Sequence, residues 1–172
     1  MNDFLKTVLT RRSVRAFKPD PVSREDLETL MEAASYAPSG MNRQTWEFTA
    51  VANPEKIQKL AALIKEELGR DKYDMYQPAA LIIPSNLKDT PFGKEDNACA
   101  LENIFLTAHS MGIGSVWINQ LQGICDKPAI RAFLTELGIP EDHVVYGMAA
   151  LGYAAKEPSQ DVKKTAVKRI VE

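Results

Sequence analysis

The amino-acid sequence predicts one layered domain in which α-helices are interleaved with about four β-strands. Two observations lead to this fold class. Apolar residues recur at one-turn spacing in several segments, as in amphipathic helices, and the short apolar or alternating runs between them have the composition of strands. At 172 residues the chain is long enough to bury one core, and it contains no internal repeat and no linker that would divide it. We therefore treat residues 1–172 as a single domain.

Helical periodicity predicts five helices. Ser23 is expected to cap the second of them, with Asp26 three residues later, and this helix stops before Pro38. The fourth helix is unusually apolar and is expected to lie at the centre of the core. The five segments are residues 3–12, 24–37, 55–68, 96–111 and 127–137.

Four segments have the composition of strands. They are residues 45–51, 79–85, 112–119 and 143–153, with a polar loop expected over 86–95. The segment "GIGSVWIN" leads into a strand, and no strand is followed by a GxGxxG turn that opens a helix. Because this spacing does not match the dinucleotide fingerprint, we do not expect a Rossmann domain.

Composition excludes several classes of protein. Twenty-one Lys and Arg against 23 Asp and Glu give a net charge of −2, whereas nucleic-acid binding needs a broad basic surface. The only cysteines, Cys99 and Cys125, form no CxxC motif, so neither a disulfide framework nor a structural zinc site is expected. The first dozen residues lack the apolar core of a signal peptide, and no stretch is long enough to span a membrane. We expect a cytoplasmic protein with no nucleic-acid or membrane partner.

The segment "RRSVRAF", residues 11–17, concentrates positive charge in an otherwise mildly acidic chain. Arg11, Ser13 and Arg15 alternate, so in extended backbone their side chains point to the same side. Forked guanidinium groups beside a hydroxyl suit a phosphate or an electron-rich heterocycle. A solvated helix end is the alternative, because the dipole of a helix favours cations at its C-terminus.

The loop "APSGMNRQ" also allows two interpretations. Ser39, Asn42 and Gln44 could bind the polar edge of a ring or a sugar chain, or they could simply form a turn. Neither His109 nor His143 lies in a nucleophile motif, and the sequence contains no GxSxG, HExxH or P-loop pattern. We therefore expect no catalytic side chain and no metal, and an enzyme with this sequence would borrow its reactive group from a cofactor.

Four segments taken in order, "RRSVRAF", "APSGMNRQTWEF", "GIGSVWINQL" and "ALGY" with its basic tail, resemble the nitroreductase family of flavoproteins from about residue 3 to 165. The resemblance implies an α+β fold, a three-layer sandwich whose central sheet is mixed and mainly antiparallel. It also implies bound FMN and a homodimer with shared active sites. The implied reaction is the ping-pong reduction of nitro compounds, quinones or similar small acceptors by NAD(P)H.

The same resemblance implies which residues bind FMN. The basic segment would contribute Arg11 and Ser13 at the phosphate and ribityl chain, Arg12 beside them, and Arg15 at the pyrimidine edge. The partner subunit would contribute its loop residues Pro38, Ser39, Gly40 and Asn42, with Gln44 also near the flavin. The stretch packed on the ring would be Trp117, Ile118, Asn119 and Gln120. Lys163 or Lys164 would complete the phosphate site, and the tail from about 154 to 172 would extend onto the partner.

This chain departs from the family pattern at three points. Thr45 stands where a proline is common, Gln120 stands where many members have glycine, and the chain is short, which implies a more open pocket. Two other functions are consistent with the same residues. One is a different flavin reaction, namely flavin destruction or reductive dehalogenation, and the other is non-catalytic FMN binding.

Overall fold

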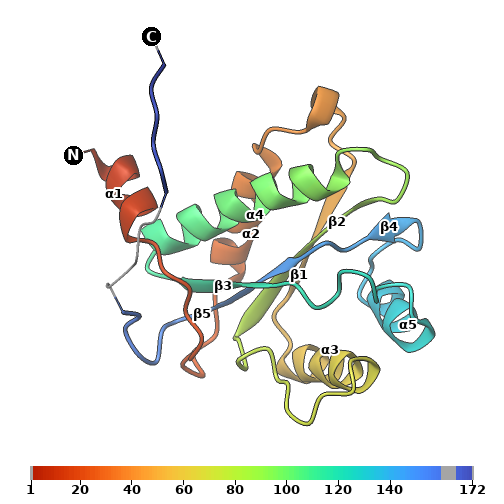
Figure 1. The fold of residues 1–172 in the computed structure, drawn as a ribbon. Coiled ribbons are helices and arrows are strands. Elements are labelled where there is room, and N and C mark those ends of the chain that lie inside the picture. The colour runs from red at the N-terminus through yellow and green to blue at the C-terminus, as the bar shows by residue number, and fades with distance from the viewer. Residues whose placement is uncertain (1, 160–165, 172) are drawn as a thin grey trace.

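The structure is a computed structural model that describes residues 2–159 and 166–171. It is a three-layer α+β fold in which one sheet lies between two layers of helices (Figure 1). The helices are α1 (Asp3–Thr10), α2 (Arg24–Ser35), the 3-10 helix η1 (Gly40–Asn42), α3 (Pro54–Glu67), α4 (Gly93–Ser110) and α5 (Pro128–Glu136). The predicted three-layer sandwich is confirmed.

The sheet is mainly antiparallel. Its strands are β1 (Trp46–Val51), β2 (Ala80–Leu87), β3 (Gly114–Ile118), β4 (His143–Val144) and β5 (Met148–Gly152). The strand order is β1-β2-β5-β3, with β4 paired to β2, and every named pair is antiparallel. A parallel bridge between Ser13 and Ser115 makes the sheet mixed, as expected.

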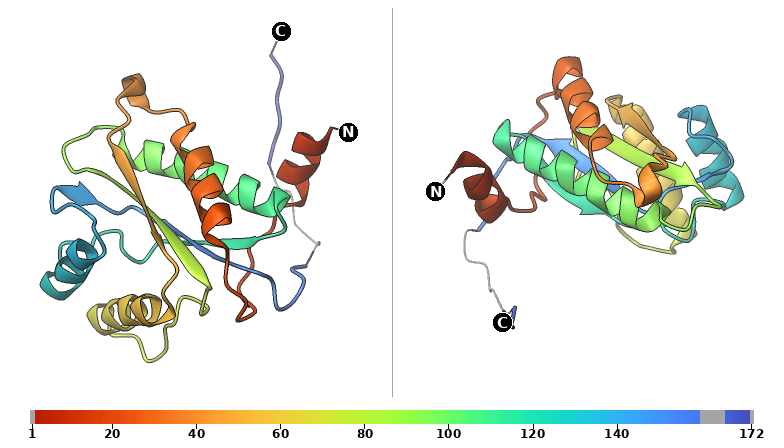
Figure 2. Two further views of the ribbon diagram at one scale, coloured as in Figure 1. Left: turned by 180° about the vertical axis from the view of Figure 1, so that it is seen from behind. Right: turned by 90° about the horizontal axis from the view of Figure 1, so that it is seen from above.

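Alternation along β2 explains the two helical layers. Leu81 and Ile83 point to a core cluster that includes residues of α3 and α5, whereas Ala80 and Ile82 point to a second cluster with α2 and α4. Figure 2 shows the two pairs of helices on opposite faces of the sheet. A strand buried on both faces has no polar alternation, which is why the first part of β2, residues 80–84, is a continuous apolar run.

The expected single strand over 143–153 is two strands in the structure. Residues 145–147 interrupt it, and a Cβ atom at Gly147 would lie 2.5 Å from the indole Nε1 of Trp117. The chain therefore leaves the ladder where the indole lies against it. The apolar pattern continues through the break, so periodicity alone did not reveal it.

The polar loop expected over 86–95 is shorter in the structure. Strand β2 continues to Leu87 and α4 begins at Gly93. Asn86 is buried, and the hydroxyl of Thr45 donates a hydrogen bond to its side-chain oxygen over 3.2 Å. A polar residue with such a partner can lie near the end of a buried strand, although polar residues are more typical of a loop.

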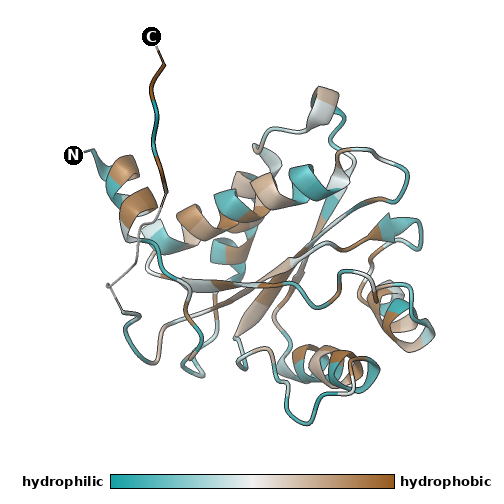
Figure 3. Ribbon diagram, viewed as in Figure 1, coloured by the Kyte–Doolittle hydropathy of each residue, from teal (hydrophilic) through white to brown (hydrophobic). Residues whose placement is uncertain are grey.

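Helix α1 packs least among the α-helices. None of its residues is buried, and its apolar side chains are exposed, with Phe4 at 70%. Figure 3 shows these apolar turns at the margin of the molecule. Across the residues that the structure describes, no helix has both the length and the apolar character needed to cross a membrane.

Candidate functional site along the edge of strand β3

The basic segment runs in extended conformation along the start of edge strand β3. The backbone N–H of Val14 donates to the carbonyl of Ser115 over 2.9 Å, beside the Ser13–Ser115 bridge. Further along, Phe17 forms an antiparallel bridge with Ala154. These contacts hold the segment against the sheet and keep it from continuing helix α1.

Glycines in the strands make this close approach possible. A Cβ atom at Gly114 would lie 2.8 Å from Cγ2 of Val14, and one at Gly152 would lie 2.9 Å from the ring of Phe17. Real Cβ atoms do not approach their neighbours so closely, so larger residues would push the basic segment off the sheet. The glycine of "GIGSVW" that lies in β3 therefore serves packing, and it has no role in a phosphate-binding turn.

The side chains of the basic segment divide into two groups. Val14 is buried while Arg11, Ser13 and Arg15 are partly or fully exposed, as expected for alternating residues. Neither Arg11 nor Arg15 forms an ion pair with any other described residue. Both guanidinium groups are therefore available to an anionic ligand.

Arg12 behaves differently from its neighbours. Its Nη1 donates to the carbonyl oxygens of Leu9, over 2.9 Å, and Arg11, over 2.7 Å, at the C-terminal end of α1. The helix-end interpretation thus applies to Arg12. Arg12 also lines a cavity of about 200 Å³ together with Thr10 and His109.

The far end of β3 provides aromatic and amide groups. Trp117 is 38% exposed, packs against the ring of Phe105 at a centroid distance of 6.0 Å, and donates its indole N–H to Oδ1 of Asn119 over 3.2 Å. Ile118 is 2% exposed and belongs to the core, so it offers a ligand little side-chain surface. Gln120 is half-buried at the strand's end.

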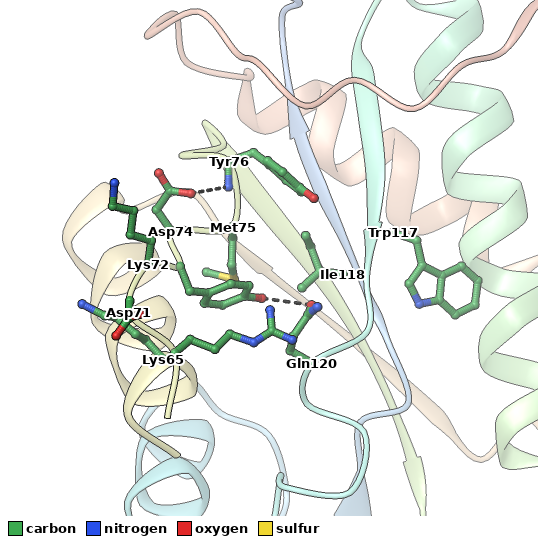
Figure 4. A pocket seen from close by; sticks show the side chains of 11 residues that line it. Lys65, Asp71, Lys72, Asp74, Met75, Tyr76, Trp117, Ile118 and Gln120 are labelled. Carbon is green, nitrogen blue, oxygen red and sulfur yellow. Dashed lines mark hydrogen bonds between the residues drawn. The ribbon is translucent and has the colours of Figure 1, made fainter. Parts of the chain in front are cut away.

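A cavity of about 550 Å³ lies at this end of β3 (Figure 4). One wall consists of Trp117, Ile118 and Gln120, and the other is the loop that follows α3, residues 70–76. This loop was not among the predicted site residues. Its signal is the pair of tyrosines among charged residues in "GRDKYDMYQ", between a helix and a strand.

The two ends of the β3 edge together fit one elongated ligand. Ser115 and Ile118 are three residues apart, which corresponds to about 10 Å of strand. At one end lie arginines without carboxylate partners among the described residues, and at the other the amide of Gln120 lies beside the cavity, while the indole of Trp117 points to the opposite side of β3 (Figure 4). This donor set fits a molecule with a phosphate at one end and a flat heterocycle at the other, as FMN has.

The loop expected to contact the flavin lies away from this edge. Gly40 donates its backbone N–H to Oδ1 of Asp96 over 2.8 Å, and a Cβ atom at Gly40 would overlap the ring of Phe92 at the start of α4. None of the five loop residues lines the β3 cavity. The residues concerned are Pro38, Ser39, Gly40, Asn42 and Gln44. Within one chain the structure does not bring them to the site, and Lys163 and Lys164 lie outside the described residues.

His109 is held in a structural contact. The hydroxyl of Thr10 donates its only proton to the carbonyl of Lys6. It therefore accepts the hydrogen bond that joins it to His109, and His109 Nε2 is the donor over 2.9 Å. Burial, followed by the charges of Arg11 and Arg12, lowers the pKa of this histidine. In the described part of the chain, no group of three or more His, Cys, Asp or Glu could hold a metal ion.

The fold and the donor set define a class, an α+β domain whose sheet edge fits an elongated anionic cofactor. Comparison with known proteins identifies the family. The chain matches the model of the nitroreductase family over residues 8–80 and 70–153, and it belongs to this family.

Individual relatives agree with this assignment. A crystal structure of a nitroreductase with bound FMN from Bacteroides fragilis NCTC 9343 is 42% identical, covers 100% of both chains and superposes with a TM-score of 0.94. A "Putative NADH dehydrogenase/NAD(P)H nitroreductase" of Archaeoglobus fulgidus is 35% identical over 91% of this chain and 88% of its own. An "FMN reductase (NADPH)" of Bacillus subtilis is 27% identical over 87% of this chain and 65% of its own. The family is thus one of NAD(P)H-dependent flavin oxidoreductases.

Proposed function

We propose that the protein is an FMN-dependent oxidoreductase that uses NAD(P)H to reduce nitro compounds, quinones or similar small acceptors. The observation that carries the proposal is the β3 edge, with Arg11 and Arg15 free of carboxylate partners among the described residues at one end. Trp117 and Gln120 border a cavity at the other end. The FMN in the Bacteroides fragilis relative supports the same ligand.

The residues of the edge have distinct proposed roles. Arg11 and Ser13 would bind the phosphate and ribityl chain, and Arg15 would lie at the pyrimidine edge, where a positive charge favours an anionic ring. Trp117 would pack on the ring system. When bound, FMN would supply the redox chemistry, taking a hydride from NAD(P)H and passing electrons to the acceptor in ping-pong order. No side chain need act as a nucleophile.

We also propose that the active protein is a homodimer with shared sites. The loop over 38–44 lies away from the β3 cavity of its own chain, so it would complete the cavity of a second copy. The exposed apolar face of α1 and the exposed tail residues Val167, Ile170 and Val171 would be covered by that copy. The single domain of residues 1–172 would then extend its tail, from about 154, onto the partner.

The absorption spectrum of the purified protein, followed by mass identification of the released chromophore, tests the proposal. We expect flavin bands, the mass of FMN, and bleaching of those bands when NADH or NADPH is added without oxygen. A colourless protein that takes up no added FMN would contradict it. Bound FMN that neither nucleotide reduces would indicate a non-catalytic binder, and loss of flavin during turnover would indicate flavin destruction.

A further inference from the structure

Gln120 accepts two hydrogen bonds on one atom. The hydroxyl of Tyr73 donates to Gln120 Oε1 over 3.0 Å, and the backbone N–H of Asn119 donates to the same oxygen over 3.1 Å. Figure 4 draws the bond from the tyrosine as the dashed line that reaches Gln120. The loop after α3 is thereby joined to the end of β3 across the cavity.

These two donors determine how the amide of Gln120 is oriented. A backbone N–H is always a donor, and burial raises the pKa of Tyr73, so its hydroxyl keeps its proton. The atom that faces both must be the amide oxygen. The NH₂ group of Gln120 is therefore turned from these donors, and no described residue accepts a hydrogen bond from it. Gln120 itself lines the cavity.

The loop that carries Tyr73 is firmly anchored. The guanidinium of Arg70 lies 5.3 Å from the centre of the Tyr73 ring, and Met75 is 1% exposed in the core. Asp74 accepts hydrogen bonds from the backbone N–H of Tyr76 and the side chain of Gln77, both at 3.0 Å.

The backbone of the same loop is in an unfavourable region. Residues 75, 76 and 77 have φ values of 54°, 66° and 49°, and none of them is glycine. Three successive left-handed residues persist only where the surrounding contacts determine them. The anchored loop can therefore hold the hydroxyl of Tyr73 in a fixed place.

We propose that Tyr73 is a positioning residue that directs the NH₂ group of Gln120 at the flavin ring. The inference rests on the proposed function, because it needs FMN in the β3 cavity. The backbone N–H of Asn119 is bonded to Gln120 Oε1, so the NH₂ group is the donor that the Gln120 side chain can offer to the ring. A donor aimed at the ring binds the electron-rich reduced flavin more tightly than the oxidised flavin. Tyr73 thus raises the flavin potential through Gln120.

The test measures the midpoint potential of bound FMN and the dissociation constant of oxidised FMN. Tyr73→Phe and Gln120→Ala should each lower the ratio of affinities for reduced over oxidised flavin threefold to tenfold, which is up to about 30 mV for a two-electron couple. The double variant should change the ratio no more than one substitution does, because both remove the same interaction. Tyr146→Phe is the matched control, since Tyr146 does not line the β3 cavity and its side chain forms no hydrogen bond with a described residue.

Each outcome decides a different point. Gln120→Ala with an unchanged potential would overturn the inference and assign the donor to a backbone N–H. An unchanged flavin potential in Tyr73→Phe would overturn the positioning role alone. The same conclusion would follow if the double variant changed the affinity ratio by the sum of the two single effects. If Tyr73→Phe does not fold, Gln120→Glu tests the same point, because its carboxylate still accepts from Tyr73 and Asn119 but cannot donate. A wild-type protein that binds no FMN would instead contradict the proposed function.

Discussion

The backbone of Gly147 lies directly against the indole of Trp117, so that a Cβ atom at position 147 would be 2.5 Å from Nε1 and 2.8 Å from Cε2. This contact interrupts the strand between β4 and β5 and seats the indole beside Phe105. One glycine thus couples the shape of the sheet to the proposed flavin surface.

Gly147→Ala should displace Trp117 and weaken FMN binding. Overpacking at such a contact costs about 1–3 kcal/mol in free energy of unfolding. Urea unfolding and FMN titration would measure both effects. In a Trp117→Ala background the added methyl group has room, so Gly147→Ala should lower the free energy of unfolding much less there. Equal costs in both backgrounds would show that the strain arises elsewhere.

Arg15→Ala should weaken FMN binding or shift the potential of the bound flavin. A hydrogen bond to a charged group contributes about 1.5–3 kcal/mol, so we expect roughly a tenfold to hundredfold rise in the dissociation constant. Fluorescence titration with FMN measures it. Arg24→Ala is the control, because Arg24 is exposed on α2, where it pairs with Glu28 one turn along the same helix. Unchanged affinity and potential for Arg15→Ala would remove this residue from the site.

Asp96→Ala should release the loop at Gly40. Asp96 is 3% exposed and accepts the Gly40 N–H, and losing such a partner costs about 1–3 kcal/mol. Limited proteolysis between residues 38 and 44 would report the order of the loop. If the loop completes the site of a second copy, FMN affinity should fall as this order is lost. Asp96→Asn keeps an acceptor oxygen and should behave almost like wild type. Full FMN affinity in Asp96→Ala would argue against a flavin role for this loop.

His109 should make the protein less stable in mild acid. Burial, then Arg11 and Arg12, lowers the pKa of His109 from its ordinary value of 6.5, so below that pH the unfolded chain binds a proton that the folded chain resists. The contribution to stability is complete above pH 6.5 and is lost as the pH falls toward the lowered pKa.

Urea unfolding of wild type and His109→Gln between pH 5 and 8 would measure this effect. The unfolding free energy of wild type minus that of His109→Gln should be constant above about pH 7.5. Below pH 6.5 this difference should fall, because the wild type loses stability that the variant keeps. Parallel pH profiles would show that His109 is not the source. Because His109 has no proposed part in the reaction, FMN affinity at pH 8 should stay the same.

Local sequence patterns were enough to predict much of the fold. The five helices were predicted within a few residues of their bounds, because an apolar stripe at one-turn spacing depends only on neighbouring positions. The alternation of Arg11, Ser13 and Arg15 likewise follows from extended backbone, and the structure buries Val14 between them. The order and spacing of the motifs also indicated the family, since both are properties of the linear chain.

Contacts between distant residues required the tertiary structure. Tyr73 and Gln120 are 47 positions apart, and they meet only because the loop after α3 faces the end of edge strand β3. The break at Gly147 depends on a tryptophan in another strand. The sequence by itself determined which segments are helical, which are extended and where the charges are concentrated. The strand order decided which of those segments share a site, because side chains far apart in sequence interact only after the sheet has brought them together.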